Sequence, residues 1–325
     1  MGPVSDQPPN LRLRGTFRCA IMRKQYSLEK VTDVEYEYRT DIRDNEALRA
    51  SFNALTRRVF GFDFAGWRAG GWWAKEHTGY APHALVRDGE VIANVSLTPL
   101  ALDIAGERLH ALQLGTVMTD PAWRGQGLQR VLMEQALDGA ADRYDMIYLY
   151  ANDSVMDFYP KFGFAPAMEY AFSRALPRGI GPAARQADMD SAADQARLLA
   201  LYGQGNPFSL ATAPEETGLL MFYCGGFMKD NVYFIDALSA AAVAEYDGDA
   251  LLLSDVFCPA GTALEDVLRA LARPGVQRVT FGFTPKDAAD MTCAPIEEDG
   301  GLFVMKGLRN PFAERKMRLP ELSHT

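Results

Sequence analysis

The chain has 325 residues, of which 48% are hydrophobic and 23% charged, and its formal net charge is −9. At roughly 100–200 residues per domain, this length predicts two domains or one large α/β domain. The apolar content excludes a disordered chain, and no apolar run approaches the roughly 18 residues of a membrane span, so we expect no membrane partner. A general nucleic-acid binder needs a basic face, and the negative balance argues against nucleic acid as a partner.

The cysteines and histidines show no spacing typical of a metal site. The four cysteines are scattered without a CxxC pattern, and the four histidines lack HExxH or HxH spacing. We therefore expect no metal. Unpaired, scattered cysteines also favour a reducing compartment, which predicts a cytoplasmic protein.

Residues 1–34 show no clear periodicity and begin with a Pro-rich stretch. We expect a flexible, solvated tail. The stretch has basic residues, as a targeting peptide does, but not the apolar core of a secretory signal. Met22 stands shortly before the first structure-like sequence, so a start at Met22, which would leave residues 1–21 out of the native protein, is an alternative.

From residue 35 onward, strand-like and helix-like patterns alternate. Period-two runs predict strands, 3.6-residue spacing predicts helices, and Asp88-Gly89 predicts a tight hairpin turn. The expected elements are, in order, a strand over 35–42, a helix from Asp44 to Gly61, a helix over 64–76, strands over 83–87, 91–97, 102–104 and 109–119, a helix from Leu128, a strand over 145–150, a short helix over 154–162 and a strand over 169–174. This order predicts a mixed sheet with helices on its faces.

The most informative segment is Thr119–Leu128, which reads TDPAWRGQGL. A strand ends here, a glycine-punctuated loop follows, and a helix begins. Glycines let backbone N–H groups converge on an anion, the helix N-terminus favours negative charge, and Arg124 adds a cation. The loop is not a dinucleotide fingerprint, because Arg130 stands where the third glycine would fall, and it lacks the Gly-Lys-Ser/Thr of a P-loop. Spacing alone leaves two interpretations, an anion site or an ordinary strand–helix turn.

Two segments resemble motifs of the GNAT superfamily of N-acetyltransferases. The run 119–128 is similar to V-x-P-x-x-R-G-x-G-[IL], with Thr119 where a valine is usual. Asn152, Tyr159 and Gly163-Phe164 are similar to the N-x-x-A-x-x-L-Y-x-x-x-G-F segment, with Val155 in place of the alanine. The resemblance covers about residues 35–175. It implies an α/β fold with a GNAT-like mixed, mostly antiparallel sheet flanked by helices, and an acetyl-CoA-binding domain over 35–176.

The resemblance implies acetyl-CoA as co-substrate, without a metal, in a V-shaped gap between the strands at 115–119 and 145–150. The pyrophosphate would lie on the backbone of Arg124, Gly125, Gln126, Gly127 and Leu128. The pantetheine arm would pair with Val117, Met118 and Thr119, and Asn152 would hold it from the other side. Tyr159 would give a proton to the CoA thiolate, the alternative being a core tyrosine beside Phe158 and Phe162.

Direct acetyl transfer to an amine needs a neutral amine, a donor for the oxyanion and a proton for the leaving thiolate. A backbone N–H near Met118 or Thr119 suits the oxyanion. The base stays open among a water chain and four carboxylates, Glu76, Glu90, Asp120 and Asp153. Aromatic residues, among them Trp72 and Trp73, fall where the substrate-facing helices of the family lie, so these two are candidates for binding the acceptor, with core packing as the alternative.

The Pro/Gly-rich segment 177–182 predicts a linker. Beyond it we expect a helix over 191–202, an apolar segment over 216–227, strands over 232–238, 241–246 and 250–258, a helix over 262–272 and a strand over 276–283. This β-β-β-α-β order repeats the first half, so residues 183–325 resemble a second, degenerate GNAT-like domain. Its loop at 259–262 lacks the Arg-Gly-x-Gly pattern, so we expect no acetyl-CoA site there, and a role in shaping the acceptor pocket or in forming a homodimer.

The sequence therefore favours an acetyl-CoA-dependent N-acetyltransferase that acts on a primary amine of a small molecule or peptide. The acidic net charge favours a cationic acceptor through electrostatic steering. A non-catalytic acyl-CoA-binding or sensing module is the alternative.

Overall fold

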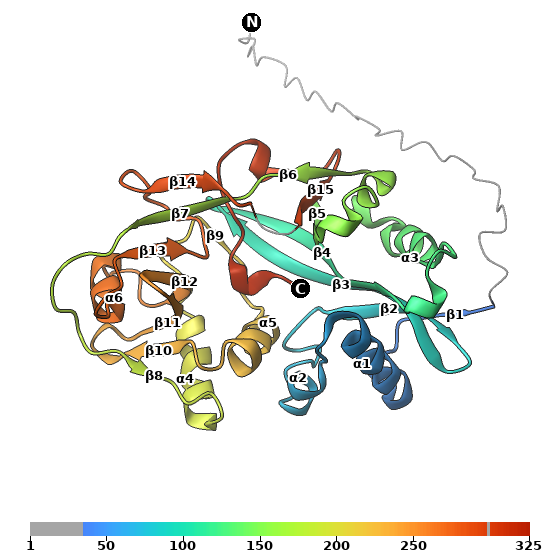
Figure 1. The fold of residues 1–325 in the computed structure, drawn as a ribbon, viewed down its shortest axis with the longest axis horizontal. Coiled ribbons are helices and arrows are strands. Elements are labelled where there is room, and N and C mark those ends of the chain that lie inside the picture. The colour runs from blue at the N-terminus through green and yellow to red at the C-terminus, as the bar shows by residue number, and fades with distance from the viewer. Residues whose placement is uncertain (1–34, 298–299) are drawn as a thin grey trace, which may run out of the picture.

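The computed structural model describes residues 35–297 and 300–325, which form two sheets lying side by side with helices packed against them (Figure 1). The tail expected over 1–34 lies outside the described residues. No helix in the described ranges is long and apolar enough to cross a membrane.

The first sheet has the strand order β1-β2-β3-β4-β5-β15-β6, and the short strand β9 (Ala211–Thr212) pairs with β3. Its strands are β1 (Glu37–Arg39), β2 (Ala81–Arg87), β3 (Glu90–Ile104), β4 (Glu107–Thr119), β5 (Met146–Ala151), β6 (Phe164–Ala167) and β15 (Gly301–Met305). The expected Asp88-Gly89 hairpin is confirmed as the turn between β2 and β3. The interruption expected after residue 97 is wrong, because β3 continues to Ile104 and pairs with β4 along its length.

The second sheet has the strand order β14-β7-β13-β12-β11-β10-β8. Its strands are β7 (Tyr170–Ala175), β8 (Arg185–Gln186), β10 (Val232–Ile235), β11 (Ala240–Asp247), β12 (Ala250–Phe257), β13 (Arg278–Phe281) and β14 (Thr292–Pro295). The helices of the molecule are α1 (Glu46–Phe60), α2 (Ala65–Ala69), α3 (Leu128–Leu137), α4 (Ala192–Tyr202), α5 (Thr217–Phe222) and α6 (Leu264–Leu271).

Local chemistry sets the helix ends. The N-cap of α1 is Asn45, whose side chain accepts from Leu48 N, and not the expected Asp44, while Gly61 ends the helix in the left-handed region at φ 82°. The aromatic helix expected over 64–76 is much shorter. It ends at Ala69, because Gly70-Gly71 follows and Gly71 takes φ 83°, which a helix does not allow.

The expected internal repeat is confirmed. In β2-β3-β4-α3-β5, three antiparallel strands lead into a helix and then into a strand parallel to the third. The same order recurs in β10-β11-β12-α6-β13. Each crossover helix buries one apolar face on its own sheet, Leu132 and Met133 in α3 and Val267 and Leu268 in α6.

The two sheets exchange a strand. The segment expected to close the first sheet, β7, pairs instead with β13 in the second sheet, and β15 takes the equivalent place beside β5 in the first. Accordingly, Phe303 of β15 packs into the first core, and Phe172 of β7 into the second. The boundary between the two sheets therefore does not coincide with the linker at 177–182. We call the ranges 35–176 and 183–325 the first and second halves of the chain, and their assignment as two domains stays a prediction.

Candidate active site

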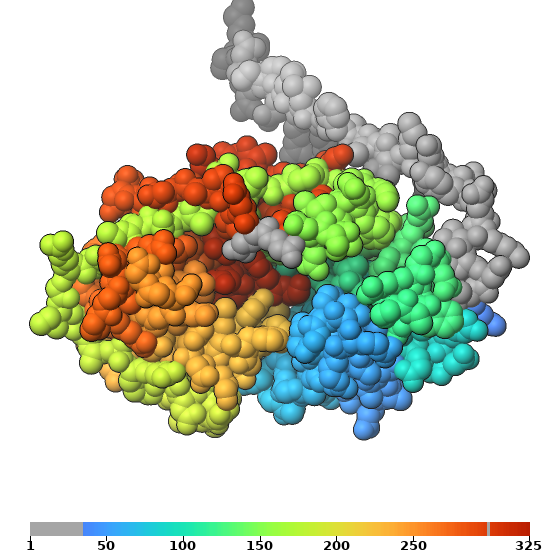
Figure 2. All heavy atoms as spheres, viewed as in Figure 1, coloured from blue at the N-terminus to red at the C-terminus, as the bar shows by residue number. Residues whose placement is uncertain are grey.

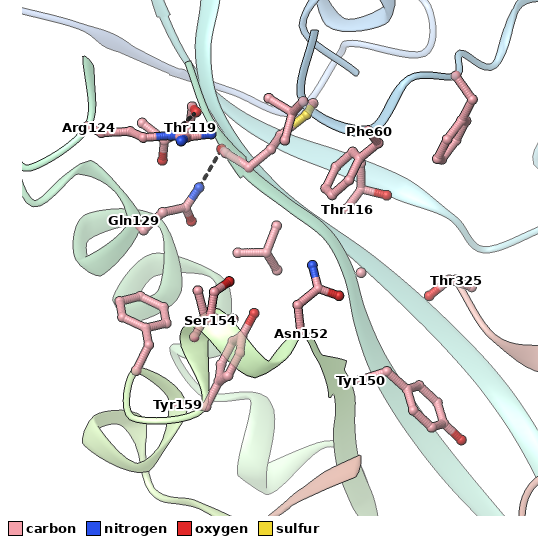
Figure 3. Close-up of a pocket in the computed structure, with 17 residues that line it drawn as sticks. Phe60, Thr116, Thr119, Arg124, Gln129, Tyr150, Asn152, Ser154, Tyr159 and Thr325 are labelled. Atoms are coloured by element: carbon pink, nitrogen blue, oxygen red, sulfur yellow. Dashed lines mark hydrogen bonds between the residues drawn. The ribbon is translucent and has the colours of Figure 1, made fainter. Parts of the chain in front are cut away.

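A gap opens in the first sheet where β4 and β5 diverge. These parallel strands pair from Ala111↔Met146 to Leu114↔Leu149 and not beyond. A cavity of about 650 Å³ occupies the gap and is lined by residues 115–119 of β4 and by Tyr150, Asn152 and Tyr159 (Figure 3). The V-shaped gap expected from the sequence is thus confirmed, and it is the natural place for an extended ligand to pair with the free edge of β4.

A β-bulge shapes the β4 side of this cavity. The register between β3 and β4 shifts between Asn94 and Ser96, and Thr116 has a φ of 46°, a left-handed value that is rare for a threonine. Polar contacts hold it there, since Asn94 Nδ2 donates to Thr116 O at 2.9 Å and the Tyr80 and Thr116 hydroxyls lie 2.7 Å apart. Burial raises the pKa of Tyr80, so its hydroxyl stays protonated in this network.

The loop after β4 is built to meet an anion. Gly125 and Gly127 have φ values of 77° and 75°, which glycine adopts without strain, and α3 begins directly after them. The backbone N–H groups of residues 125–129 have no acceptor among the residues that the structure describes. Such free N–H groups at a helix N-terminus favour a phosphate. Arg124 lines the cavity next to them and donates from Nε to Thr119 O at 3.3 Å.

Gln129 ties the loop to the sheet and was not singled out from the sequence. Its Nε2 donates to Met118 O and, at 3.1 Å, to Asn94 O, so α3 is fixed against both β3 and β4 beside the bulge (Figure 3). The amide recognises two backbone carbonyls, and no sequence pattern marks such a contact in advance.

Tyr159 and Asn152 lie on the opposite side of the gap. Asn152 follows β5, and Tyr159 begins the short helical turn Tyr159–Phe162; both side chains point into the cavity (Figure 3). The Tyr159 ring is 4% exposed and packs against Phe158 and Phe303, while its hydroxyl makes no hydrogen bond with any described residue. Burial raises the pKa of Tyr159 to about 12, so the phenol keeps its proton at neutral pH and can donate it.

None of the carboxylates considered as a base from the sequence lines the cavity. Asp120 pairs with Arg58 and caps the turn at Ala122 N, and Glu90 accepts from Ser51 Oγ at 2.6 Å. Asp153 accepts from Gly300 N at 2.9 Å, and Glu76 is exposed. Within the described ranges, no Asp or Glu side chain lines this cavity or the apolar cavity beside it.

That second, apolar cavity, of about 330 Å³, adjoins the first and shares Phe62, Thr116 and Thr325 with it. Its other walls are Phe64, Trp67, Tyr80, Leu219, Phe222, Tyr223, Phe227 and His324. In Figure 2 the segment of α1 in blue and that of α5 in yellow-orange flank a hollow whose floor is the dark red segment that ends at Thr325. Both halves of the chain therefore contribute to this cavity.

Neither Trp72 nor Trp73, the residues expected to bind the acceptor, lines these two cavities. Trp73 is fully buried, stacks on Trp67 and donates from Nε1 to Tyr80 O, so it belongs to the core. Trp72 lines an adjoining cavity, which shares Phe222 and Phe227 with the apolar one. The sequence did not single out Phe62, Phe222 and Phe227, which line the apolar cavity. The only signal for these three residues is the density of aromatic residues in FGFDF and MFYCGGF.

Comparison with known proteins agrees with this geometry. Residues 43–167 match the acetyltransferase (GNAT) domain. A search of curated proteins gave no match. Among solved structures, a "probable N-acyltransferase" from Enterococcus faecalis V583 is 15% identical with a TM-score of 0.58, covering 89% of this chain and 73% of that one. Eis1 from Mycobacterium abscessus is 16% identical with a TM-score of 0.51, and the match covers 83% of this chain and 73% of that one. A GCN5-related N-acetyltransferase from Kribbella flavida is 17% identical with a TM-score of 0.51, and the match covers 83% of this chain and 71% of that one.

Residues 43–167 thus match a GNAT acetyltransferase domain, and the two sheets share the fold of these solved structures. The matched segment includes the loop at 119–128, Asn152 and Tyr159.

Proposed function

We propose that this protein transfers the acetyl group of acetyl-CoA to a primary amine in the gap between β4 and β5. One observation carries the proposal. The splayed edge of β4 and the protonated phenol of Tyr159 border one cavity, and Arg124 and Gln129 line it at the two ends of a loop whose five consecutive N–H groups have no acceptor among the described residues. An anion site, an edge for an extended arm and a proton donor are what CoA binding and thiolate release require.

The residues present fit acetyl-CoA. The N–H groups of Gly125–Gln129 and the Arg124 guanidinium would hold the pyrophosphate. Val117, Met118 and Thr119 would pair with the pantetheine amides, and Asn152 faces that edge across the gap. Arg124 is also the only Lys or Arg side chain among the described residues that line the cavity, so in a protein of net charge −9 it concentrates positive potential where an anion binds.

The reaction needs no nucleophile from the protein. The amine nitrogen forms a bond to the thioester carbonyl carbon while the carbon–sulfur bond breaks, and the amine gives up one proton to water. Tyr159 supplies the proton that the sulfur takes up and then regains one from the solvent, so the protein is unchanged after the reaction. A backbone N–H of β4 near the bulge, at Met118 or Thr119, would donate to the carbonyl oxygen as charge develops on it. Alignment of the two substrates along β4 supplies the remaining acceleration.

The test combines acetyl-CoA binding by calorimetry with release of the CoA thiol in the presence of a panel of primary amines. We expect binding that free CoA competes for, and thiol release with at least one amine. Tight binding without thiol release from any amine would instead identify a non-catalytic acyl-CoA sensor. Failure to bind acetyl-CoA would contradict the assignment of the cavity itself.

A further inference from the structure

We infer that the apolar cavity beside the gap binds an aromatic group of the acceptor, so that the acceptors are arylalkylamines rather than small polar amines or polycations. This inference rests on the proposed function and names the substrate class of the same site. Its basis is the lining of the cavity, in which aromatic rings from both halves of the chain surround about 330 Å³, a volume that suits one aromatic ring with a short alkyl chain.

The aromatic walls form a continuous series of ring contacts from the surface inward. Phe227, which is 62% exposed, meets Phe222 at 5.3 Å between centroids, Phe222 meets Phe64 at 5.6 Å, and Phe64 meets the buried Tyr80 at 5.3 Å. A ring that enters along this series finds aromatic partners at every depth. Each such contact adds to the gain from burying apolar area.

The cavity lies where the acceptor amine must arrive. It shares Thr116 with the acetyl-CoA cavity, at the bulge, whereas Thr119 and Arg124 lie at the opposite end of that cavity (Figure 3). It also has its own exposed rim at Phe227. An acceptor has to enter while acetyl-CoA occupies the gap, and a separate rim allows this. A longer acyl chain would enter with its CoA and would not need a second opening.

The lining of the apolar cavity itself does not favour a polycation, although Asp63 and Asp190 line the adjoining cavity that shares Phe222 and Phe227 with it. Among the described residues, no Asp, Glu, Lys or Arg side chain lines it. The histidine that lines it, His324, packs against Tyr150 with ring centroids 3.9 Å apart. Burial lowers the pKa of His324 to about 3, so its imidazole is neutral. Apolar surroundings disfavour an ammonium and lower its pKa, which favours the neutral amine that the reaction needs.

The second half of the chain sets the shape of this wall. Trp67 Nε1 donates to Gly218 O at 2.7 Å, and Gly218 N donates to His77 O at 2.8 Å, so the start of α5 is fixed against the first half. A Cβ on Gly218 would lie 2.7 Å from Thr78 Cβ, which only glycine avoids. From this anchor α5 and the π-helical turn Tyr223–Phe227 carry four side chains of the wall. π-helical turns recur at functional sites.

The experiment compares 2-phenylethylamine with ethylamine, which differ by the phenyl ring. We expect kcat/KM for thiol release from acetyl-CoA to be at least about thirtyfold higher for 2-phenylethylamine, since burial of a ring is worth roughly 2 kcal/mol. Phe227→Ala removes an exposed wall residue without disturbing the core, and we expect it to lower this ratio about three- to tenfold. Leu219→Trp fills the cavity and should lower the ratio further. Tyr38→Ala, an exposed aromatic on β1 outside both cavities, should leave the ratio unchanged.

Four outcomes would overturn the inference, and they are distinguishable. If the ratio is near one and Phe227→Ala does not change it, the cavity does not bind an aromatic group of the acceptor, and the proposed acetyl transfer still stands. A higher kcat/KM with octanoyl-CoA than with acetyl-CoA, lost in Leu219→Trp, would assign the cavity to the acyl chain. Thiol release faster with spermidine than with 2-phenylethylamine would assign the site to polycations. No release with any amine would contradict the proposed function, and the substrate class with it.

Discussion

The rings of Phe62 and Phe227 meet edge to face, with centroids 5.5 Å apart and an interplanar angle of 88°. Phe62 follows α1 in the first half, and Phe227 ends the π-helical turn after α5 in the second. Both rings line the apolar cavity, so its mouth exists only where the two halves meet. The loop at 119–128, which we propose binds the pyrophosphate, belongs in contrast to the first half alone.

Substitution of Gly125 by Asp tests the anion-binding loop. The carboxylate would stand among the free N–H groups and repel a phosphate, so we expect the Kd for acetyl-CoA to rise at least about tenfold, equivalent to 1.4 kcal/mol. Calorimetry on the full chain measures this.

Gly139 offers a matched control for the loop. It has a left-handed φ of 63°, against 77° for Gly125, and a Cβ on either glycine would meet nothing within 4 Å. Gly139→Asp should therefore lose similar stability through backbone strain, yet keep the acetyl-CoA affinity of the wild type. Equal affinities in both variants would contradict the loop assignment.

Substitution of Tyr159 by Phe tests the proton donor. The ring stays in the core and only the hydroxyl is lost, so we expect kcat to fall by about 10²–10⁴-fold while the Kd for acetyl-CoA stays within about twofold. Because the pKa of Tyr159 is raised to about 12, its proton is present throughout the measurable range, and this group should cause no loss of kcat up to about pH 11.

Tyr144→Phe is the control for Tyr159. Tyr144 packs on the same core but does not line the cavity, so its variant should keep the kcat of the wild type. If kcat is unchanged in Tyr159→Phe, the hydroxyl of Tyr159 takes no part in the reaction.

Substitution of Gly300 by Ala tests the coupling of the exchanged strand to the site. A Cβ on Gly300 would lie 1.8 Å from Ala151 O, at the end of β5 next to Asn152, and its φ is 102°. The end of β5 must move, so we expect a loss of about 2–4 kcal/mol in the free energy of unfolding and weaker acetyl-CoA binding. Thermal unfolding and calorimetry measure the two effects.

Gly307, on the other side of β15, separates strain from displacement. Its φ is 85°, but a Cβ there meets nothing within 4 Å. Gly307→Ala should cost about 1–2 kcal/mol for the left-handed backbone and leave acetyl-CoA binding intact. If Gly300→Ala also bound acetyl-CoA normally, β15 would not set the position of Asn152.

The pH dependence of stability should report on Asp255. Burial raises its pKa to about 7, although Asn206 Nδ2 and Val256 N donate to its carboxylate. Between about pH 4 and pH 7 the folded chain therefore binds more protons than the unfolded one, and the free energy of unfolding falls as the pH rises, by about 1.4 kcal/mol for each pKa unit.

Asp255→Asn cannot ionise, so its melting temperature should exceed that of the wild type at pH 8 by several degrees, and the difference should shrink toward pH 4. Glu216, whose pKa is also raised to about 7, leaves a residual slope in the variant. Asp249→Asn, which makes the same substitution at an exposed carboxylate, is the control for the change of side chain itself. A difference that is constant with pH would contradict the ionisation of Asp255 as its cause.

The side of the cavity that we propose for acetyl-CoA could be predicted from the sequence because its signals are local. Arg124, Gly125 and Gly127 lie within one loop, and Asn152 and Tyr159 lie seven positions apart, so each group forms a short motif that can be compared with a known family. Turn geometry and helix caps act over the same short range, which is why the hairpin at Asp88 and the end of α1 at Gly61 were also predicted.

The strand exchange and the acceptor wall could not be predicted, because they depend on contacts between distant segments. β7 and β15 are both short apolar strands that pair antiparallel with a buried neighbour, so no local pattern decides which sheet receives which strand. Trp73 and Trp67 likewise carry the same aromatic signal, and only the turn at Gly70-Gly71 sends one into the core and the other to the cavity wall.

The exchange of strands also sets the timing of folding during synthesis. On the ribosome, β5 and β6 emerge long before β15, which must lie between them, so both keep an open edge while the second half is being made. The gap beside β5 can reach its final form only after β15 arrives. A nascent chain that already carries the whole loop at 119–128 therefore still lacks the finished cavity, and its unpaired strand edges are where a chaperone would be needed most.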